Sequence, residues 1–234
     1  MSLRPAPALG PATTQLTADE LMHRWNELCR RVASAGGDPD GVTVVAVTKG
    51  SDAAVVALAR SVGMEHFGEN YASELTAKAP AADGAHWHFL GSVQRNKVRR
   101  LAPHVWMWQG VDRAAAAEAI AARQPGARVL VQVNLTRDSH RGGCAELDAP
   151  GLVEHCRALS LDVRGLMGIG PAGDQVSSRN CFRGLSRLTR SLELPELSAG
   201  MSDDFEEAVA EGSTMIRIGR LLFGPRPGPG RARH

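Results

Sequence analysis

Residues 42–50 read VTVVAVTKG, so a run of apolar, β-branched residues ends in Lys49 and Gly50. Such residues favour strands, and the glycine that follows leads into a helical pattern. The segment therefore predicts a buried strand with a lysine at its carboxyl end. That lysine is either a side chain whose stem covers the strand end or an amine that can attack a carbonyl. The chain has three lysines and 24 arginines, which favours a specific role for Lys49.

The alternation of short apolar runs with helical stretches continues along the chain. Eight strands are predicted, over residues 42–47, 64–67, 87–90, 105–111, 129–135, 163–169, 197–201 and 215–218. Seven helices are predicted between them, over residues 53–62, 69–78, 94–101, 113–123, 150–160, 176–192 and 203–211. Parallel strands need crossover connections, so this order predicts an α/β fold with a parallel sheet. Eight units favour a closed (β/α)8 TIM-type barrel over an open Rossmann-like sheet, because no G-x-G-x-x-G loop follows the first strand, where that fold carries it.

The two ends of the chain differ in character from its body. Thr17 and Glu20 form a capping box, and apolar residues then recur at helical spacing until Gly36, which predicts an additional N-terminal helix. Residues 1–16 are rich in Pro and Ala and predict a disordered leader, as residues 227–234 predict a disordered tail. The barrel is therefore expected over residues 17–226.

Composition narrows the class of protein. A hydrophobic share of 43%, a charged share of 22% and a net charge of +2 are ordinary for a globular protein and predict no nucleic-acid partner. No apolar run reaches the roughly 18 residues that span a bilayer, so no membrane partner is expected. The four cysteines are widely spaced, with no C-x-x-C pair and no signal-peptide pattern. These features predict a soluble, cytoplasmic protein with reduced thiols.

Polar and small residues follow several predicted strands, and the carboxyl ends of barrel strands are where reactive residues belong. The candidate binding residues at these ends are Lys49, Asn70, Ser198, Met201, Ser202, Arg217, Gly219 and Arg220. Ser202 is either a helix N-cap or a phosphate ligand, and the two roles are compatible. Arg217 lies between two isoleucines and is either paired with a barrel carboxylate such as Glu69 or aimed at a ligand nitrogen or phosphate.

Metal and hydrolase sites are disfavoured. His86 and His88 share one face of a strand, but no third ligand follows at a suitable spacing, which favours packed or polar histidines. The cysteines lack a pattern typical of an activated thiol. Neither G-x-S-x-G nor H-E-x-x-H occurs.

Seven segments, taken in order, resemble the pyridoxal phosphate homeostasis protein family, single-domain relatives of the alanine racemase N-terminal barrel. They are VTVVAVTKG at 42–50, HFGENY at 66–71, WHFLGSVQRNK at 87–97, VLVQVNL at 129–135, RGLMGIGP at 164–171, LSAGMSDDFEEAVAEGSTMIRIG at 197–219 and FGPR at 223–226. The resemblance implies a (β/α)8 barrel that holds pyridoxal 5'-phosphate as a Schiff base on Lys49. It further implies that Arg217 faces the pyridine nitrogen, and that Ser202 and the backbone around Gly219 hold the phosphate.

The same resemblance implies vitamin B6 homeostasis without substrate turnover and without catalytic residues. A permanent cation at the pyridine nitrogen weakens the cofactor as an electron sink. The racemase also uses a tyrosine from a second domain, whereas this chain has only Tyr71. We therefore expect a carrier that passes the cofactor to apo-forms of pyridoxal phosphate enzymes. We also expect a monomer, because the resemblance is to a single-domain protein without the second domain through which the racemase dimerises. The alternatives are an amino acid racemase or lyase that pairs Lys49 with Tyr71 or His66, and a barrel that binds only an anion.

Some positions depart from the family pattern. Gly50 replaces a threonine after the lysine, and residues 92–94 read SVQ where the family has His-Leu-Gln. Arg220 replaces a threonine after Gly219, so either a hydroxyl worth roughly 1 kcal/mol beside the phosphate is lost or an inward-turned Arg220 adds positive charge there. Arg141 stands in place of a lysine after the fifth strand, which removes a lysine-based secondary site. These changes predict weaker cofactor binding than is usual in the family.

Overall fold

The computed structural model describes residues 16–136, 138, 141–171, 173 and 175–225. The predicted leader, apart from Leu16, and the predicted tail lie outside these residues. None of the helices in the described part of the chain has the length and apolar character that a bilayer crossing requires.

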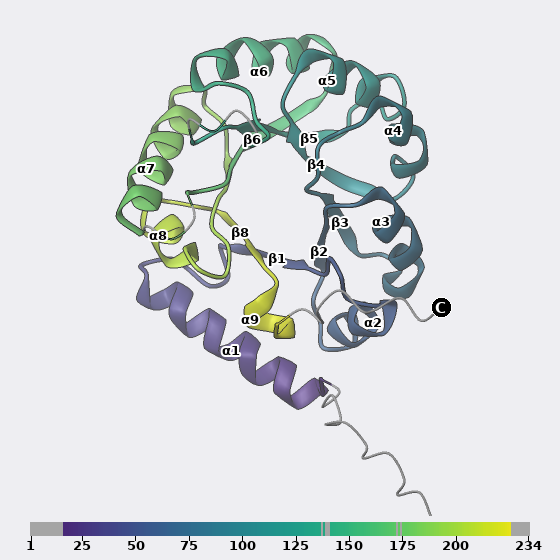
Figure 1. Ribbon diagram of the computed structural model, residues 1–234, viewed down its shortest axis with the longest axis vertical. Helices are drawn as coiled ribbons and strands as arrows, with labels where there is room; N and C mark the ends of the chain where they lie inside the picture. The colour runs from purple at the N-terminus through teal and green to yellow at the C-terminus, as the bar shows by residue number, and fades with distance from the viewer. Residues whose placement is uncertain (1–15, 137, 139–140, 172, 174, 226–234) are drawn as a thin grey trace, which may run out of the picture.

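Eight parallel strands close into a barrel in the order β1 to β8, with β8 pairing back onto β1 (Figure 1). The strands are β1 (Thr43–Val47), β2 (His66–Glu69), β3 (His86–Phe89), β4 (Val105–Val111), β5 (Arg128–Val133), β6 (Asp162–Gly168), β7 (Glu196–Ser198) and β8 (Met215–Ile218). This closed sheet confirms the predicted (β/α)8 barrel and rules out the open Rossmann-like alternative.

Helices form a ring around the sheet and alternate with the strands (Figure 1). They are α2 (Ala53–Ser61), α3 (Ala72–Lys78), α4 (Arg95–Leu101), α5 (Ala114–Ala121), α6 (Ala149–Ala158), α7 (Gln175–Ser191), α8 (Phe205–Ala210) and α9 (Arg220–Phe223). Two 3-10 turns, η1 (Ala79–Ala82) and η2 (Glu146–Asp148), extend the connections after α3 and before α6. Large buried side chains such as Trp108 and Phe182 fill the layer between strands and helices, which is the main hydrophobic core.

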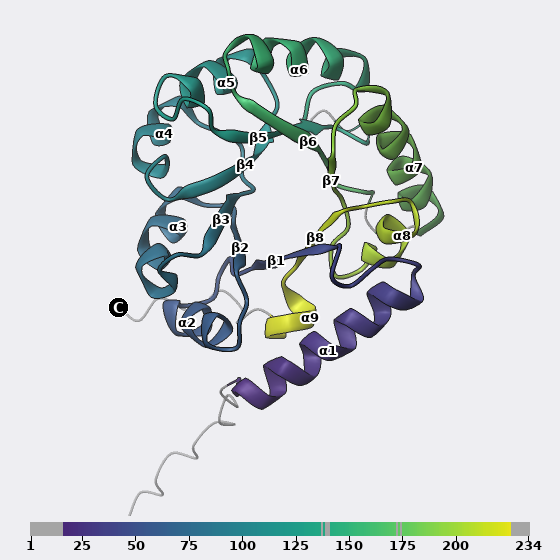
Figure 2. The ribbon, with the colours of Figure 1, turned by 180° about the vertical axis from the view of Figure 1, so that it is seen from behind.

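The predicted N-terminal helix is confirmed as α1 (Ala18–Ser34). Its N-cap Thr17 and Glu20 form the expected capping box, in which the Thr17 Oγ1 accepts from the Glu20 N–H. The helix lies outside the ring, alongside α8, α9 and α2 (Figure 2). Arg31 donates two hydrogen bonds to Glu206 of α8, both 2.9 Å long, which anchors the far end of the helix.

Several boundaries differ from the sequence prediction, and those of β2, β7 and α8 bear on the site. β2 begins at His66, not at residue 64, and it includes Glu69, which was expected in the following helix. β7 is only three residues long and ends at Ser198, although the Ala199 N–H and the Gly200 carbonyl still hydrogen-bond to the backbone of β8. Helix α8 begins at Phe205, two residues later than expected.

Apolar and polar side chains both line the inside of the barrel. The apolar cluster is formed by side chains of five strands: Val45, Met107, Leu130, Met167 and Met215. The polar group is a series of hydrogen bonds that links Arg217, Ser198, Gln109, His88 and His66. Its links are 2.7 to 2.9 Å long. Each of these five side chains therefore has a hydrogen-bond partner, as buried polar groups require.

A change at Gly165 tests how closely β6 and β7 approach each other. A bulge at Arg164 shifts the register of β6, so that Leu130 pairs with Gly165. A Cβ at Gly165 would overlap the Glu196 carbonyl oxygen, whereas one at Gly184 on α7 meets nothing. We expect Gly165→Ala to lower the free energy of unfolding by about 1–3 kcal/mol or more and Gly184→Ala to leave it unchanged or raise it by up to about 1 kcal/mol. Urea unfolding measures both, and coincident curves would contradict the packing described here.

The buried histidines predict a loss of stability in acid. Burial, followed by the nearby His86, lowers the pKa of His66 to about 4, and burial lowers the pKa of His88 well below its usual range. Below about pH 6.5 the unfolded chain therefore binds protons that the folded chain does not, so stability falls as the pH drops from 6.5 towards 4. Urea unfolding at several pH values should show this slope, and His66→Leu should reduce it. His23→Leu, at an exposed site of α1, is the control. Equal slopes for both variants would refute the assignment of the acid-induced loss of stability to His66.

Candidate functional site

Lys49 lies at the carboxyl end of β1, at one mouth of the barrel. Val45 points into the barrel, so the alternation of a strand places Val47 and Lys49 on the same inner side. The lysine is half-buried and its neighbour Gly50 has a φ of +77°, a left-handed conformation that glycine adopts readily. The chain therefore turns away immediately after Lys49, which leaves the lysine at the rim.

Asn70 lies beside Lys49 on the neighbouring strand. Ala46 pairs with Phe67 and Val47 with Gly68, and continuing this register brings Asn70 level with Lys49. Asn70 is half-buried just after the end of β2. The structure thus brings these two predicted residues together at the mouth.

Arg217 lies inside the barrel and is 5% exposed. Its Nη1 donates to the Ser198 Oγ at 2.7 Å and its Nη2 to the Gly168 carbonyl at 2.8 Å. Burial lowers the pKa of Arg217 to about 10, and the charge of Asp204 opposes this shift. The guanidinium is therefore a buried cation at neutral pH whose two described hydrogen bonds go to uncharged oxygens.

The predicted alternative, an ion pair between Arg217 and Glu69, is wrong. Glu69 faces the outer side of the barrel wall, where its Oε1 accepts from Lys78 at 2.7 Å and from the Thr48 hydroxyl at 2.6 Å. Strand alternation explains the difference, since Gly68 and Asn70 occupy the inward positions of this segment. Burial raises the pKa of Glu69, and the hydrogen bonds from Lys78 and Thr48 oppose the rise.

Two predicted serines lie close together in sequence, Ser198 at the end of β7 and Ser202 in the loop after it. Ser198 is fully buried and links Arg217 to Gln109, so it acts on the mouth through Arg217. Ser202 is half-buried at the rim, and it is not the N-cap of α8. That position belongs to Asp204, because the helix starts later than its sequence pattern indicates.

Asp204 shapes this loop from within. Its Oδ1 accepts from the Met201 N–H at 2.7 Å, and burial raises its pKa. Gly200 has a φ of +93°, and a Cβ there would lie 2.8 Å from the Phe205 Cα. Only glycine therefore fits the tight approach of this loop to α8, which holds Ser202 at the mouth.

The loop after β8 meets the loop after β7. Gly219 precedes the short helix α9, and a Cβ at this position would lie 3.1 Å from the Val47 carbonyl oxygen. Arg220 forms an exposed ion pair with Asp203, the residue after Ser202. The predicted anion-binding residues thus lie on two adjoining loops, although an exposed pair of this kind adds little stability.

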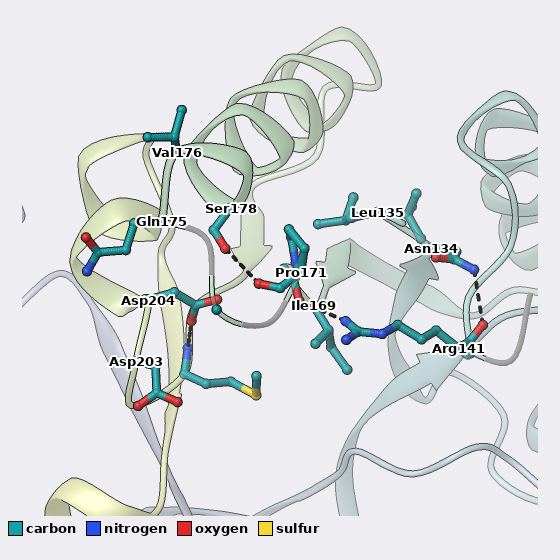
Figure 3. Close-up of a pocket in the computed structure, with 15 residues that line it drawn as sticks. Asn134, Leu135, Arg141, Ile169, Pro171, Gln175, Val176, Ser178, Asp203 and Asp204 are labelled. Atoms are coloured by element: carbon teal, nitrogen blue, oxygen red, sulfur yellow. Dashed lines mark hydrogen bonds between the residues drawn. The ribbon is translucent and has the colours of Figure 1, made fainter. Parts of the chain in front are cut away.

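A cavity of about 800 Å³ opens beside these residues, over the carboxyl ends of β5, β6 and β7 (Figure 3). Its polar lining includes Asn134, Arg141 and Asp204, and the Arg141 Nη1 donates to the Gly170 carbonyl at 2.9 Å (Figure 3). Among the residues that the structure describes, Met201 is the predicted site residue that lines it. The cavity therefore lies at the β5–β7 side of the mouth, whereas Lys49 follows β1 and Arg217 belongs to β8.

The histidines and cysteines lie in settings that suit packing. His86 stacks on Trp106 with ring centroids 4.5 Å apart, and His88 is bonded to His66 and Gln109. Within the described ranges, no group of three or more His, Cys, Asp or Glu is placed to hold a metal ion. Burial raises the pKa of the Cys144 and Cys156 thiols to about 11, so neither is a thiolate at neutral pH.

Sequence analysis missed several residues that support this mouth. They are Lys78 and Glu74 behind β1, Gln109 and His88 beneath Arg217, and Asp204 in the loop after β7. Gln109 had a signal, because it interrupts the apolar run of β4. Lys78 is one of only three lysines, yet nothing in its local pattern indicates that it folds back onto β1.

The arrangement combines an amine, a buried guanidinium and anion-binding groups. Lys49 supplies the amine, Arg217 the cation, and Ser202 and the Gly219 turn supply a hydroxyl and backbone N–H groups at the rim. Such a set suits a small ligand that carries a carbonyl, a hydrogen-bonding ring atom and an anionic group.

Comparisons with known proteins agree with this chemistry. Residues 16–227 match the family described as alanine racemase, N-terminal domain. The pyridoxal phosphate homeostasis protein of Pseudomonas aeruginosa is 40% identical over 203 residues, which are 82% of this chain and 88% of that protein. The Escherichia coli K12 protein of the same name is 35% identical over 234 residues, covering 89% of this chain and 97% of its own.

A solved structure shows the same fold. PipY of Synechococcus elongatus, determined with pyridoxal phosphate bound, has a TM-score of 0.74 and is 33% identical. The match covers 84% of this chain and 100% of PipY. Together with the matched segments and the closed barrel, these comparisons confirm the predicted relationship: this chain belongs to the pyridoxal phosphate homeostasis protein family, which shares the barrel of the alanine racemase N-terminal domain.

Proposed function

We propose that this protein binds pyridoxal 5'-phosphate for vitamin B6 homeostasis, holding it as a Schiff base on Lys49 without substrate turnover. The observation that carries the proposal is Arg217, a buried cation inside the barrel whose described hydrogen-bond acceptors are the uncharged oxygens of Ser198 and Gly168. Burying a cation is costly unless it serves a ligand or a network. The pyridoxal phosphate bound to PipY supports the identity of that ligand.

The residues present fit the cofactor group by group. Lys49 offers an amine at the rim, and its condensation with an aldehyde forms one C=N bond and releases one water molecule. Arg217 offers an N–H donor to a pyridine nitrogen. Ser202 and the backbone at Gly219 suit the phosphate, and Arg220 offsets the charge of Asp203 beside it. Asn70 and Met201 would contact the cofactor from the two sides of the mouth.

A carrier role follows from Arg217. Bound pyridoxal phosphate supplies an electron sink that is strongest when its ring nitrogen is protonated. Arg217 would keep a positive charge near that nitrogen, because its pKa of about 10 is well above neutral pH, and would so disfavour protonation of the nitrogen. Reversible binding without carbanion chemistry suits a protein that passes the cofactor to apo-forms of pyridoxal phosphate enzymes.

The alternative is a pyridoxal phosphate-dependent racemase or lyase, which needs a second acid or base near Lys49. His66 is poorly placed for that role. It starts β2, is bonded to His88, and lies about four residues below Lys49 in the register, roughly 13 Å along the strand. Tyr71 is 61% exposed and precedes α3 at the mouth, so it remains the candidate partner.

The cysteines bear on the compartment in which the protein acts. Free thiols at all four cysteines are consistent with a cytoplasmic protein. We also propose a monomer in which residues 17–226 form the single folded domain. Light scattering of the purified chain distinguishes a monomer from a dimer.

Replacing Lys49 tests the attachment site. We expect Lys49→Ala to abolish the adduct that borohydride traps with pyridoxal phosphate, because the attacking amine is gone, while the barrel stays folded. Lys97→Ala, at an exposed site on α4, should retain the adduct. Absorption spectra and peptide mass mapping after reduction give the result. A pyridoxyl group on any other residue, or an unchanged adduct in Lys49→Ala, would overturn the attachment site.

Solvent deuterium separates a carrier from an enzyme. We expect the protein loaded with pyridoxal phosphate to leave the Cα hydrogens of the twenty free amino acids unexchanged in deuterium oxide, because Arg217 opposes carbanion formation. Mass spectrometry of each amino acid after incubation measures this. Exchange that Lys49→Ala or Tyr71→Phe eliminates would establish the racemase or lyase alternative instead.

A further inference from the structure

The two peptide groups that flank Lys49 are held by a buried ionic cluster, defined here as Lys78, Glu69 and Glu74. The Lys78 Nζ donates to the Thr48 carbonyl at 2.8 Å, which is the peptide group before Lys49. The Glu74 Oε2 accepts from the Gly50 N–H at 2.8 Å, which is the peptide group after it. The backbone of Lys49 is therefore fixed from both directions.

The cluster is closely connected within itself. The Lys78 Nζ also donates to Glu69 at 2.7 Å and to Glu74 at 2.6 Å, so its three N–H donors all have acceptors. The side chain of Lys78 is 6% exposed, that of Glu69 is fully buried and that of Glu74 is 28% exposed. A lysine with three short contacts and almost no exposure has one orientation, so the cluster is a rigid support.

The cluster lies on the opposite side of the barrel wall from the proposed cofactor. Thr48 and Glu69 face outward, towards the helices, whereas Lys49 and Asn70 belong to the inward positions of the same two segments. Lys78 ends α3 and reaches β1 from behind. Its hydrogen bond to the Thr48 carbonyl, together with that of Glu74 to the Gly50 N–H, connects the cluster to the backbone on either side of Lys49.

Stability alone is a weak reason for such a cluster. Desolvation of buried charges often cancels their attraction, and apolar residues of similar size can be as stable or more so. One Glu69 oxygen, Oε2, has no hydrogen-bond partner within the described part of the chain, which adds to the cost. The feature that an apolar replacement cannot reproduce is the pair of hydrogen bonds to the backbone on either side of Lys49.

We propose that the cluster of Lys78, Glu69 and Glu74 positions Lys49, so that its amine meets the cofactor aldehyde in a productive geometry. The inference rests on the proposed attachment of pyridoxal phosphate to Lys49. Lys78 is a positioning residue, because its own contacts are with the backbone and the two glutamates. Misplacing a reacting group by about 1 Å can cost roughly 100-fold in rate.

The test compares two ligands that differ only at the reacting group. Pyridoxal 5'-phosphate carries the aldehyde, whereas 4-deoxypyridoxine 5'-phosphate has the same ring and phosphate with a methyl group in its place. We expect Lys78→Met to form the borohydride-trappable adduct about 10- to 100-fold more slowly than the parent, and to bind the deoxy ligand within about twofold of the parent. Lys97→Met, at an exposed site on α4, controls for the loss of a lysine.

The outcomes separate the two levels of the proposal. If the parent protein forms no adduct on Lys49, the proposed function fails. If the parent forms it but Lys78→Met weakens both ligands alike, or changes neither, the positioning role is overturned and the function stands. Only a selective loss of the covalent step supports the inference.

A second pair of variants keeps the test valid if Lys78→Met does not fold. Glu74→Gln retains an oxygen that can accept from the Gly50 N–H, whereas Glu74→Ala removes it. We expect Glu74→Ala to speed hydrogen exchange at the Gly50 amide and to slow adduct formation, with Glu74→Gln close to the parent in both. Faster exchange at Gly50 with an unchanged rate of adduct formation would overturn the proposal.

Discussion

The closed parallel barrel imposes one constraint on every strand: successive side chains alternate between the inside of the barrel and the layer of helices. At the end of β1 this alternation places Thr48 and Lys49 on opposite sides of the wall. Thr48 and Glu69 face outward and meet Lys78, while Lys49 reaches the mouth. The same rule places Glu69 out of reach of Arg217. The cluster of Lys78, Glu69 and Glu74 therefore lies on the outer side of the barrel wall at the end of β1, and the candidate binding site lies on its inner side.

The interior of the barrel shows how a polar centre is kept within an apolar fold. Below the mouth, Arg217 heads a chain of hydrogen bonds through Ser198 and Gln109 to His88 and His66. Each link in this series of hydrogen bonds joins a donor to an acceptor, which offsets much of the cost of burying these side chains. The histidines remain neutral because burial lowers their pKa values. The guanidinium at the other end keeps its charge, so the positive potential is concentrated on the side of the mouth.

Much of the fold and part of the candidate site were predictable from sequence because they depend on local patterns. The alternation of strands and helices, the capping box at Thr17 and the lysine after β1 are features of short segments. The start of α8 was mispredicted because Ser202 and Asp203 have the composition of a helix N-terminus, but the tight turn at Gly200 and Asp204 delays the first helical turn. The length of β7 was overestimated for a related reason, since its apolar residues continue beyond the last ladder pair.

The sequence by itself determined the barrel, its N-terminal helix and the family, because periodicity and ordered motifs need no knowledge of contacts between distant residues. It also placed Lys49 and Arg217 on their strands. Only the tertiary structure decided which groups these residues meet. Arg217 bonds to Ser198 and Gly168, 19 and 49 residues away in the chain, and Lys78 holds Thr48 across 30 residues. Such pairings depend on strand register, barrel closure and side-chain direction, which exist only once the whole sheet has closed.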